Sequence, residues 1–121
     1  MKSDWETIAK LTAAKRDSEM GKLAQLRRKR SELEIRIDAA RQQLLDQMGA
    51  AAAAPGSGFE EWLQWNQRTR ADLQREMAVI RAQEVEQESK VSRAIGRADV
   101  VTSIRKTIAA KKKVKARRHA S

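Results

Sequence analysis

Apolar residues recur along the N-terminal half of the chain at alternating steps of three and four positions. Such spacing places them on one side of an α-helix. The stripe consists of Leu23, Leu26, Arg30, Leu33, Ile37, Ala40 and Leu44, with Arg30 as a basic interruption. Towards the N-terminus the same steps reach Trp5, Ala9, Thr12, Arg16 and Glu19. The sequence therefore predicts one long helix whose apolar stripe weakens near its beginning.

The ends of this first helix are marked by capping and turn residues. Ser3 and Glu6 have the spacing of a capping box, in which each side chain satisfies a backbone N–H at a helix start. The helix is predicted from residue 4 to residue 48, where Gly49 follows, or up to residue 54 if the alanines remain helical. Pro55 stops it in either case.

A second stripe follows the same rule over some fifty residues. It consists of Phe59, Leu63, Asn66, Arg70, Leu73, Met77, Ile80, Glu84, Gln87, Val91, Ala94, Ala98, Val101, Arg105 and Ile108. Ser57 and Glu60 form another capping-box pattern, so a helix is predicted over residues 58–109, with a basic tail over 110–121. A sustained seven-residue repeat indicates a left-handed coiled coil with a partner helix.

The connection between the two helices, residues 49–58, contains Pro55, Gly56 and Gly58 and has the length usual between antiparallel neighbours. A lone amphipathic helix cannot bury its stripe, so a linker between independent units is disfavoured. The predicted fold is all-α: a long two-helix antiparallel coiled-coil hairpin, residues 1–110, with a basic C-terminal overhang. An extended rod that pairs only with other chains is the alternative.

Folding about this turn predicts the register. It places Leu44 near Leu63, Ile37 near Arg70, Leu33 near Leu73, Leu26 near Ile80, and Trp5 near Val101. The weak part of the first stripe, Arg16 and Glu19, then falls near Glu84, Gln87 and Val91. Two alternatives are open there: Arg16 pairs with Glu84, or this zone is a soft section of the coiled coil. Arg30 needs an acidic or aqueous neighbour, because an unpaired buried charge is costly.

The charge of the chain changes character at its C-terminal end. Up to Ile104 there are 18 basic and 16 acidic residues, whereas from Arg105 onward there are 8 basic and none acidic, giving the net +10. Nucleic-acid phosphates, an anionic membrane surface and an acidic protein channel all suit such a tail. The tail has no aromatic residue to stack on bases or to anchor it in a membrane.

The absence of cysteine suits a reducing compartment, and no apolar run of about 18 residues is present to span a membrane. The expected location is the cytoplasm, peripheral at most to the inner face of the membrane. No catalytic constellation is visible, since the chain has one histidine, His119, in its tail and no cysteine or tyrosine. We therefore expect no enzyme activity, no cofactor and no metal site.

Three of the four aromatic residues gather just after the turn. Phe59 lies on the seam and Trp62 flanks it, so both are predicted to close the end of the coiled coil. Trp65 lies roughly opposite the seam, at about 100° per residue. An exposed Trp is a candidate anchor for a partner or a second copy. Trp62 and Trp65 are the candidate binding residues of the tip.

The layout resembles the FliJ/YscO family of type III export proteins. The resemblance rests on chain length, helix phase, the position of the tip and the texture of "AKRDSEMGKLAQLRRKRSELEIRIDAARQQL". It implies a hairpin similar to the stalk of the rotary ATPase gamma subunit. It also implies partners: a hexameric export ATPase, whose pore receives the paired termini, a membrane export gate protein, and export chaperones.

On this sequence, the resemblance assigns the ATPase-facing end to the termini and the basic tail. The residues concerned are Trp5, Val101, Ile104, Arg105, Lys106, Ile108, Lys111, Lys112, Lys113, Lys115, Arg117 and Arg118. The tip, with Trp65, is assigned to the gate or a chaperone, and the protein is expected to be a monomer or a weak homo-oligomer. The alternatives are a basic coiled-coil protein associated with nucleic acid and a homo-oligomeric scaffold.

Overall fold

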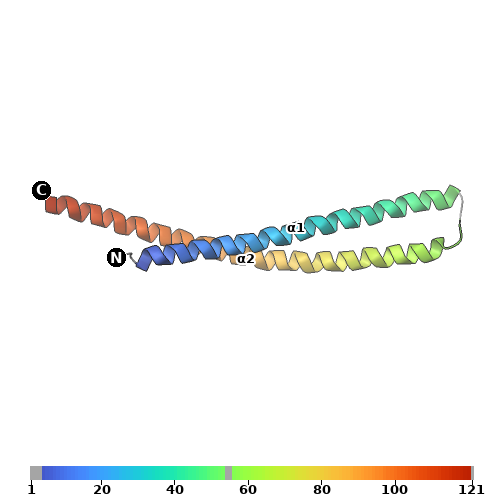
Figure 1. Cartoon of the computed structure of the whole chain (residues 1–121), viewed down its shortest axis with the longest axis horizontal. Coiled ribbons are helices and arrows are strands. Elements are labelled where there is room, and N and C mark those ends of the chain that lie inside the picture. The colour runs from blue at the N-terminus through green and yellow to red at the C-terminus, as the bar shows by residue number, and fades with distance from the viewer. Residues whose placement is uncertain (1–3, 54–55, 121) are drawn as a thin grey trace. The chain divides into compact units, whose positions relative to one another are not determined.

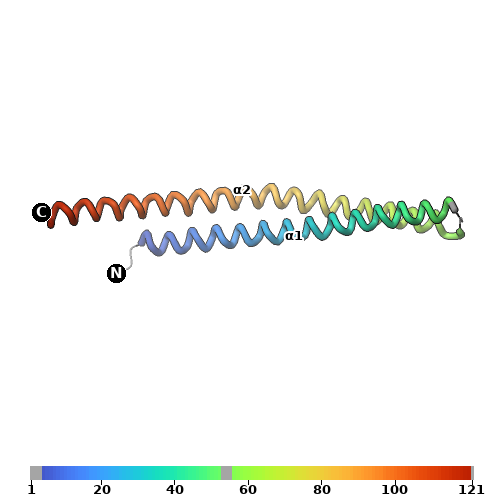
Figure 2. Tube along the Cα trace, turned by 90° about the horizontal axis from the view of Figure 1, so that it is seen from above, coloured from blue at the N-terminus to red at the C-terminus, as the bar shows by residue number. Residues whose placement is uncertain are grey.

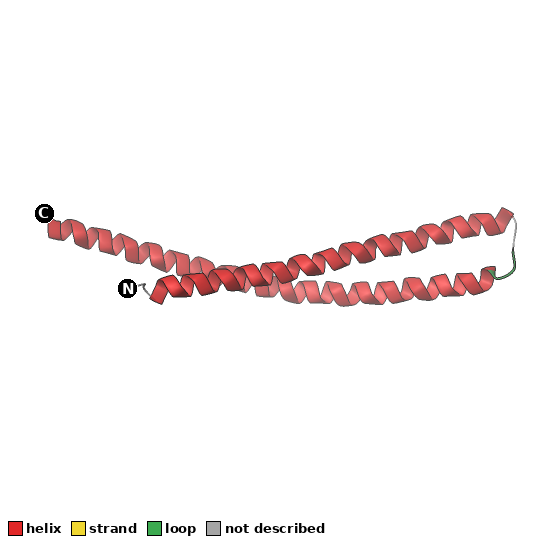
Figure 3. Cartoon of the chain, in the orientation of Figure 1, coloured by secondary structure: helices red, strands yellow, loops and turns green. Residues whose placement is uncertain are grey.

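A computed structural model shows the chain as an all-α helical hairpin (Figure 1). The structure describes residues 4–53 and 56–120. Helix α1 spans Asp4–Ala53 and helix α2 spans Phe59–Ala120, and no strand occurs among the residues described (Figure 3). The predicted fold of two long antiparallel helices is confirmed.

The two helices pair in two units. The turn unit comprises Ala24–Val85 and contains the connection between the helices. The terminal unit comprises Met1–Leu23 and Glu86–Ser121, that is, the first part of α1 and the last part of α2.

The core of the turn unit is the predicted apolar seam. It consists of the buried Leu33, Ile37, Ala40, Leu73 and Met77, with Ile80 packed against them. Leu26, Leu44 and Leu63, at the other stripe positions of this unit, are partly buried. The steps of three and four therefore identified the buried face of both helices correctly.

One polar side chain is fully enclosed in this seam. Asn66 has no exposed surface. Its Nδ2 donates a hydrogen bond to the Ala40 carbonyl at 3.1 Å, and its Oδ1 accepts one from Arg70 Nε at 2.9 Å. Burying an amide without hydrogen bonds costs free energy. The Asn66 amide keeps its acceptor on α1 only when Asn66 faces Ala40, so this alignment of the helices is favoured. A polar group in such a position specifies the register of paired helices.

The core of the terminal unit consists of smaller side chains than that of the turn unit. Its buried apolar residues are Leu23, Val91, Ala94, Ala98 and Val101. Here Gln87 of α2 donates a hydrogen bond to the Glu19 carbonyl of α1 at 2.9 Å. Glu19 and Gln87 therefore face each other. Because the helices are antiparallel, Asp4, which is fifteen residues before Glu19 and the first residue of α1, lies opposite Thr102, which is fifteen residues after Gln87. Beyond that point α2 continues without α1 beside it (Figure 2).

The end of α1 and the start of α2 differ in detail from the prediction. Helix α1 passes through Gly49 and continues to Ala53, in agreement with the longer of the two predicted ends. The first helical bond of α2 runs from the Trp62 N–H to the Gly58 carbonyl at 3.0 Å, so Gly58 is the N-cap instead of Ser57. Gly58 has a φ of 86°, which glycine adopts without steric cost. Ser3 and Pro55, which figured in the predicted helix ends, lie outside the described residues.

The C-terminal end of α2 corrects a second prediction. The helix was expected to end at 109, but it continues to Ala120. Residues 110–120 contain only alanine, lysine, arginine, valine and histidine, with neither glycine nor proline to break the helix. Arg117, Arg118 and His119 occupy the last turn, where positive charge interacts favourably with the helix dipole. The basic tail is thus part of α2.

We expect Leu73→Ala to destabilise the protein by about 2–5 kcal/mol, because it removes buried methyl groups and leaves a cavity. Leu73 is 4 % exposed. Val85→Ala, at a side chain that is 69 % exposed, serves as the control and should change stability by less than about 0.5 kcal/mol. Urea unfolding followed by circular dichroism measures both. Equal effects of the two substitutions would contradict the assignment of the seam.

Candidate functional surfaces

A buried carboxylate in the terminal unit lies at the centre of a group of polar contacts. The Glu19 side chain is 3 % exposed, and its Oε1 lies 3.0 Å from Lys15 Nζ and 3.4 Å from Lys22 Nζ. The amide Nε2 of Gln87 on α2 donates to Glu19 Oε2 at 2.7 Å. Both carboxylate oxygens are therefore occupied, one by two lysines of its own helix and the other by the facing helix.

These contacts keep Glu19 ionised. The hydrogen bond from Lys15 and then that from Gln87 lower the pKa of Glu19 from 4.5 to about 2. Burial opposes this effect by raising the pKa, but the hydrogen bonds outweigh it. The terminal unit thus contains a fixed negative charge between the helices.

A groove of about 300 Å³ opens over this carboxylate. Five basic side chains line it together with Glu19 and Ala94, and they come from both helices: Lys15, Lys22, Lys90, Arg93 and Arg97. Glu86 Oε1 also lies 3.8 Å from Lys90 Nζ, so two carboxylates face five cations and the groove keeps a positive charge.

The turn unit contains a different ion pair. Arg30 Nε lies 3.2 Å from Glu84 Oε1, and the Glu84 side chain is 6 % exposed. The two atoms are buried without hydrogen-bond geometry, so the contact is an ion pair only. It supplies the acidic neighbour that Arg30 was predicted to need.

Of the two alternatives for the weak part of the seam, the pair of Arg16 with Glu84 is not formed, because each has another partner. Arg16 Nε lies 3.1 Å from Asp17 Oδ1, its neighbour in sequence. Helical side chains point towards the N-terminus of their own helix. In an antiparallel pair, the Arg30 and Glu84 side chains therefore approach each other, although their Cα atoms are out of register.

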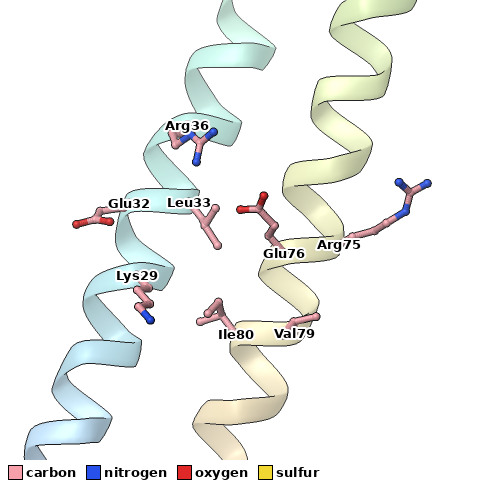
Figure 4. A pocket seen from close by; sticks show the side chains of 8 residues that line it. All are labelled: Lys29, Glu32, Leu33, Arg36, Arg75, Glu76, Val79 and Ile80. Carbon is pink, nitrogen blue, oxygen red and sulfur yellow. The ribbon is translucent and has the colours of Figure 1, made fainter.

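A second groove lies in the turn unit, with a volume of about 470 Å³. Leu33 of α1 and Ile80 of α2 point towards each other at its base, whereas Val79 and Arg75 point away from α1 (Figure 4). Lys29, Glu32, Arg36 and Glu76 complete the lining. This groove has both basic and acidic side chains in similar number, whereas the groove over Glu19 is lined mainly by basic ones.

The aromatic residues of the tip have the two environments that the sequence predicts. Phe59 and Trp62 stack with ring centroids 6.2 Å apart and 22° between their planes, and both are partly buried. Together with Ala50 and Ala51 of α1 they line a hollow of about 320 Å³. Trp65 is 51 % exposed. Whether Trp65 contacts a partner stays a prediction.

The candidate residues at the termini divide into buried and accessible positions. Val101 is 7 % exposed and belongs to the core of the terminal unit, Ile104 and Ile108 are partly buried, and Trp5 is 37 % exposed. The basic residues are all exposed: Arg105, Lys106, Lys111, Lys112, Lys113, Lys115, Arg117 and Arg118. Among these candidates, the cations and the Trp5 ring are the exposed side chains, and Ile104 and Ile108 are accessible in part.

Sequence reasoning missed the electropositive groove over Glu19. Its signal was present, since Glu19 and Gln87 both stand at stripe positions where apolar residues are usual. What the stripe alone did not reveal is that Lys15, Lys22, Lys90 and Arg97 flank those positions on the same side of the seam.

No family model, curated protein or solved structure matches the chain. Over the residues described, neither helix has a stretch apolar enough to cross a membrane.

We expect acid to destabilise the protein partly through Glu19. A carboxyl whose pKa is lowered on folding contributes stability above its unfolded value, and the contribution is lost as the pH falls. For Glu19 this range lies between about 4.5 and about 2. Glu19→Gln should flatten the loss of thermal stability over that range, as measured by circular dichroism.

Glu86→Gln is the matched control for this measurement, since the Glu86 side chain is 73 % exposed in the same unit. It should leave the pH dependence close to that of the wild type. If Glu19→Gln leaves the acid dependence unchanged while Glu86→Gln alters it, the contacts of Glu19 do not carry the effect.

Proposed function

We propose that the chain is a non-enzymatic component of a flagellar or other type III protein export apparatus. In this role it acts as the central stalk of a hexameric export ATPase and contacts an export gate protein or export chaperones. The proposal rests on the resemblance to the FliJ/YscO family together with one structural observation. That observation is the cationic end of α2, which continues past the start of α1 in the terminal unit.

The distribution of charge between the units supports this assignment. The terminal unit contains 16 basic and 7 acidic residues, a net charge of +9, whereas the turn unit contains 10 and 9, a net charge of +1. A stalk that enters the pore of a ring needs a slender end that the pore can attract. Two paired helices, reduced to one at the overhang, meet the first need, and the charge meets the second if the pore is acidic.

The tip provides a different kind of surface for a second partner. Trp65 is exposed, and apart from Trp62 and Leu63 the residues around it in sequence, from 60 to 70, are polar or charged. Trp is enriched among residues that dominate binding energy at interfaces. In the proposed role, Trp65 binds the gate protein or a chaperone, and Trp62 supports the end of the hairpin from which Trp65 projects.

A nucleic-acid-associated role is the second candidate, and the same overhang favours it. From Arg105 onward the chain has eight basic and no acidic residues. Contacts between lysine or arginine and phosphates release counterions, so such binding weakens steeply with salt. A role as a homo-oligomeric scaffold remains the third alternative, and sedimentation of the purified chain tests it.

We expect the full-length protein to stimulate ATP hydrolysis and ring assembly by the export ATPase of the same organism. A chain that ends at Ile104 should lose most of the stimulation, because it lacks the eight basic residues of the overhang. Trp65→Ala is the control and should retain stimulation, since the proposal assigns Trp65 to another partner. Steady-state phosphate release and size-exclusion chromatography of the ATPase provide the measurements.

Each outcome of this experiment has a distinct meaning. If the full-length chain gives no stimulation and binds duplex DNA with a steep salt dependence, the export proposal fails in favour of the nucleic-acid role. If the shortened chain stimulates as well as the full chain, the assignment of the overhang to the ATPase is wrong.

A further inference from the structure

Within the terminal unit, α2 has a second stripe beside the buried seam. Alternating steps of three and four from Lys90 define what we call the flank stripe: Lys90, Arg93, Arg97, Val100, Ile104, Thr107, Lys111, Val114 and Arg118. Their spacing places these residues on one face of the helix, and seven of the nine line one of two grooves. The groove over Glu19 contains the first three, and a groove of about 580 Å³ on the overhang contains Thr107, Lys111, Val114 and Arg118.

The flank stripe differs in charge from the matching stripe on the other side of the seam. It contains five basic residues and no acidic one. The opposite stripe consists of Glu88, Ser92, Ile95, Asp99, Thr102, Lys106, Ala109, Lys113 and Ala116, in which two acidic and two basic residues cancel. The positive charge of the stripes beside the seam is therefore concentrated on one flank.

Apolar side chains interrupt the basic residues of the flank stripe and are accessible. Val100 is 58 % exposed and Val114 is 48 % exposed, and Ile104 between them is partly buried. A surface that binds only phosphates gains nothing from exposed valines. The stripe has two rows with seven-residue spacing: one is basic except for Ile104, and the other contains Val100 and Val114 with Thr107 between them. Rows of charged and apolar residues at this spacing are typical of surfaces by which one helix recognises another.

We infer that the flank stripe is a docking surface for an acidic amphipathic α-helix of a partner protein. The partner helix would place apolar side chains on Val100, Ile104 and Val114 and carboxylates beside Lys90, Arg97, Lys111 and Arg118. Lys90 and Arg97 are seven residues apart, and so are Lys111 and Arg118. Between Arg97 and Lys111 the same seven-residue position is occupied by Ile104. At about 1.5 Å per residue this spacing is roughly 10 Å, which matches one heptad of a partner helix.

Two features of the terminal unit suit this occupant. Lys15 and Lys22 already hold one carboxylate, that of Glu19, in the groove that Lys90, Arg93 and Arg97 also line. Beyond Thr102, no helix among the described residues lies beside α2, and most of the stability of a helix in a protein comes from packing against a neighbour. A docked helix would supply the missing partner. This inference does not depend on the export role.

The test uses the full-length chain and a designed peptide as the probe. The peptide has four heptads with leucine at the two core positions and glutamate at the flanking positions, and it carries a fluorescent label for anisotropy. A peptide of the same pattern with lysine in place of glutamate measures non-specific binding. A labelled DNA duplex of similar length measures attraction to any polyanion.

Matched charge reversals locate the binding site. The double variant Arg97→Glu and Lys111→Glu alters the flank stripe, and the double variant Lys106→Glu and Lys113→Glu makes the same change of charge on the opposite stripe. All four side chains are exposed, so folding should be retained, which circular dichroism verifies. We expect the first variant to bind the glutamate peptide roughly tenfold more weakly than wild type, and the second to bind almost as well.

The apolar part of the stripe is tested in the same assay. Val100→Gln combined with Val114→Gln keeps the charge and should weaken binding severalfold, whereas Ile95→Gln on the opposite stripe should have little effect.

Four results would overturn the inference. The wild type does not bind the glutamate peptide at low salt, or both charge-reversal variants lose affinity equally. Duplex DNA binds more tightly than the peptide and depends on the flank stripe, which makes the surface a nucleic-acid site. The wild-type chain self-associates through the flank stripe, which makes a second copy the occupant.

Discussion

Two side-chain amides fix how α1 and α2 face each other. In the turn unit, Asn66 donates to the Ala40 carbonyl, and in the terminal unit, Gln87 donates to the carbonyl and carboxylate of Glu19. Apolar side chains tolerate sliding along a coiled coil far better than buried amides do, because a shifted amide loses its acceptor. The length of the overhang and the residues that flank the seam both follow from this register.

The polar contacts also explain why the seam remains paired where it is least apolar. Glu19, Gln87 and Glu84 occupy positions that a coiled coil usually fills with leucine or valine. Glu19 and Gln87 are hydrogen-bonded to each other across the helices, so their desolvation is largely compensated. Glu84 has only its ion pair with Arg30, which compensates its desolvation in part. The cost is a core with less apolar area than a leucine seam would bury. The benefit is a single alignment of the helices, which determines which surface residues become neighbours.

Much of this fold could be predicted because helix pairing obeys a simple period. The stripe positions from Leu23 to Leu44 and from Phe59 to Val101 are buried or partly buried, as the spacing requires. The pairing of Glu84 with Arg30 was not predicted, because the register of the Cα atoms does not include the direction in which each side chain points along its helix. Helix α2 was predicted to begin at residue 58 but begins at Phe59. Gly58 has a positive φ and is the N-cap, since its carbonyl accepts the first hydrogen bond of the helix. The Glu19 groove was missed because it depends on residues beside the stripe.

The helical overhang has a consequence for how the protein responds to its surroundings. Lysine and arginine residues four positions apart, such as Lys111 with Lys115 and Lys113 with Arg117, repel each other along the exposed helix. Salt or an anionic surface screens that repulsion. We therefore expect the stability of the helix in the overhang to depend on ionic strength. In the docking role inferred above, an acidic partner would act as a multivalent counterion that stabilises this end of α2.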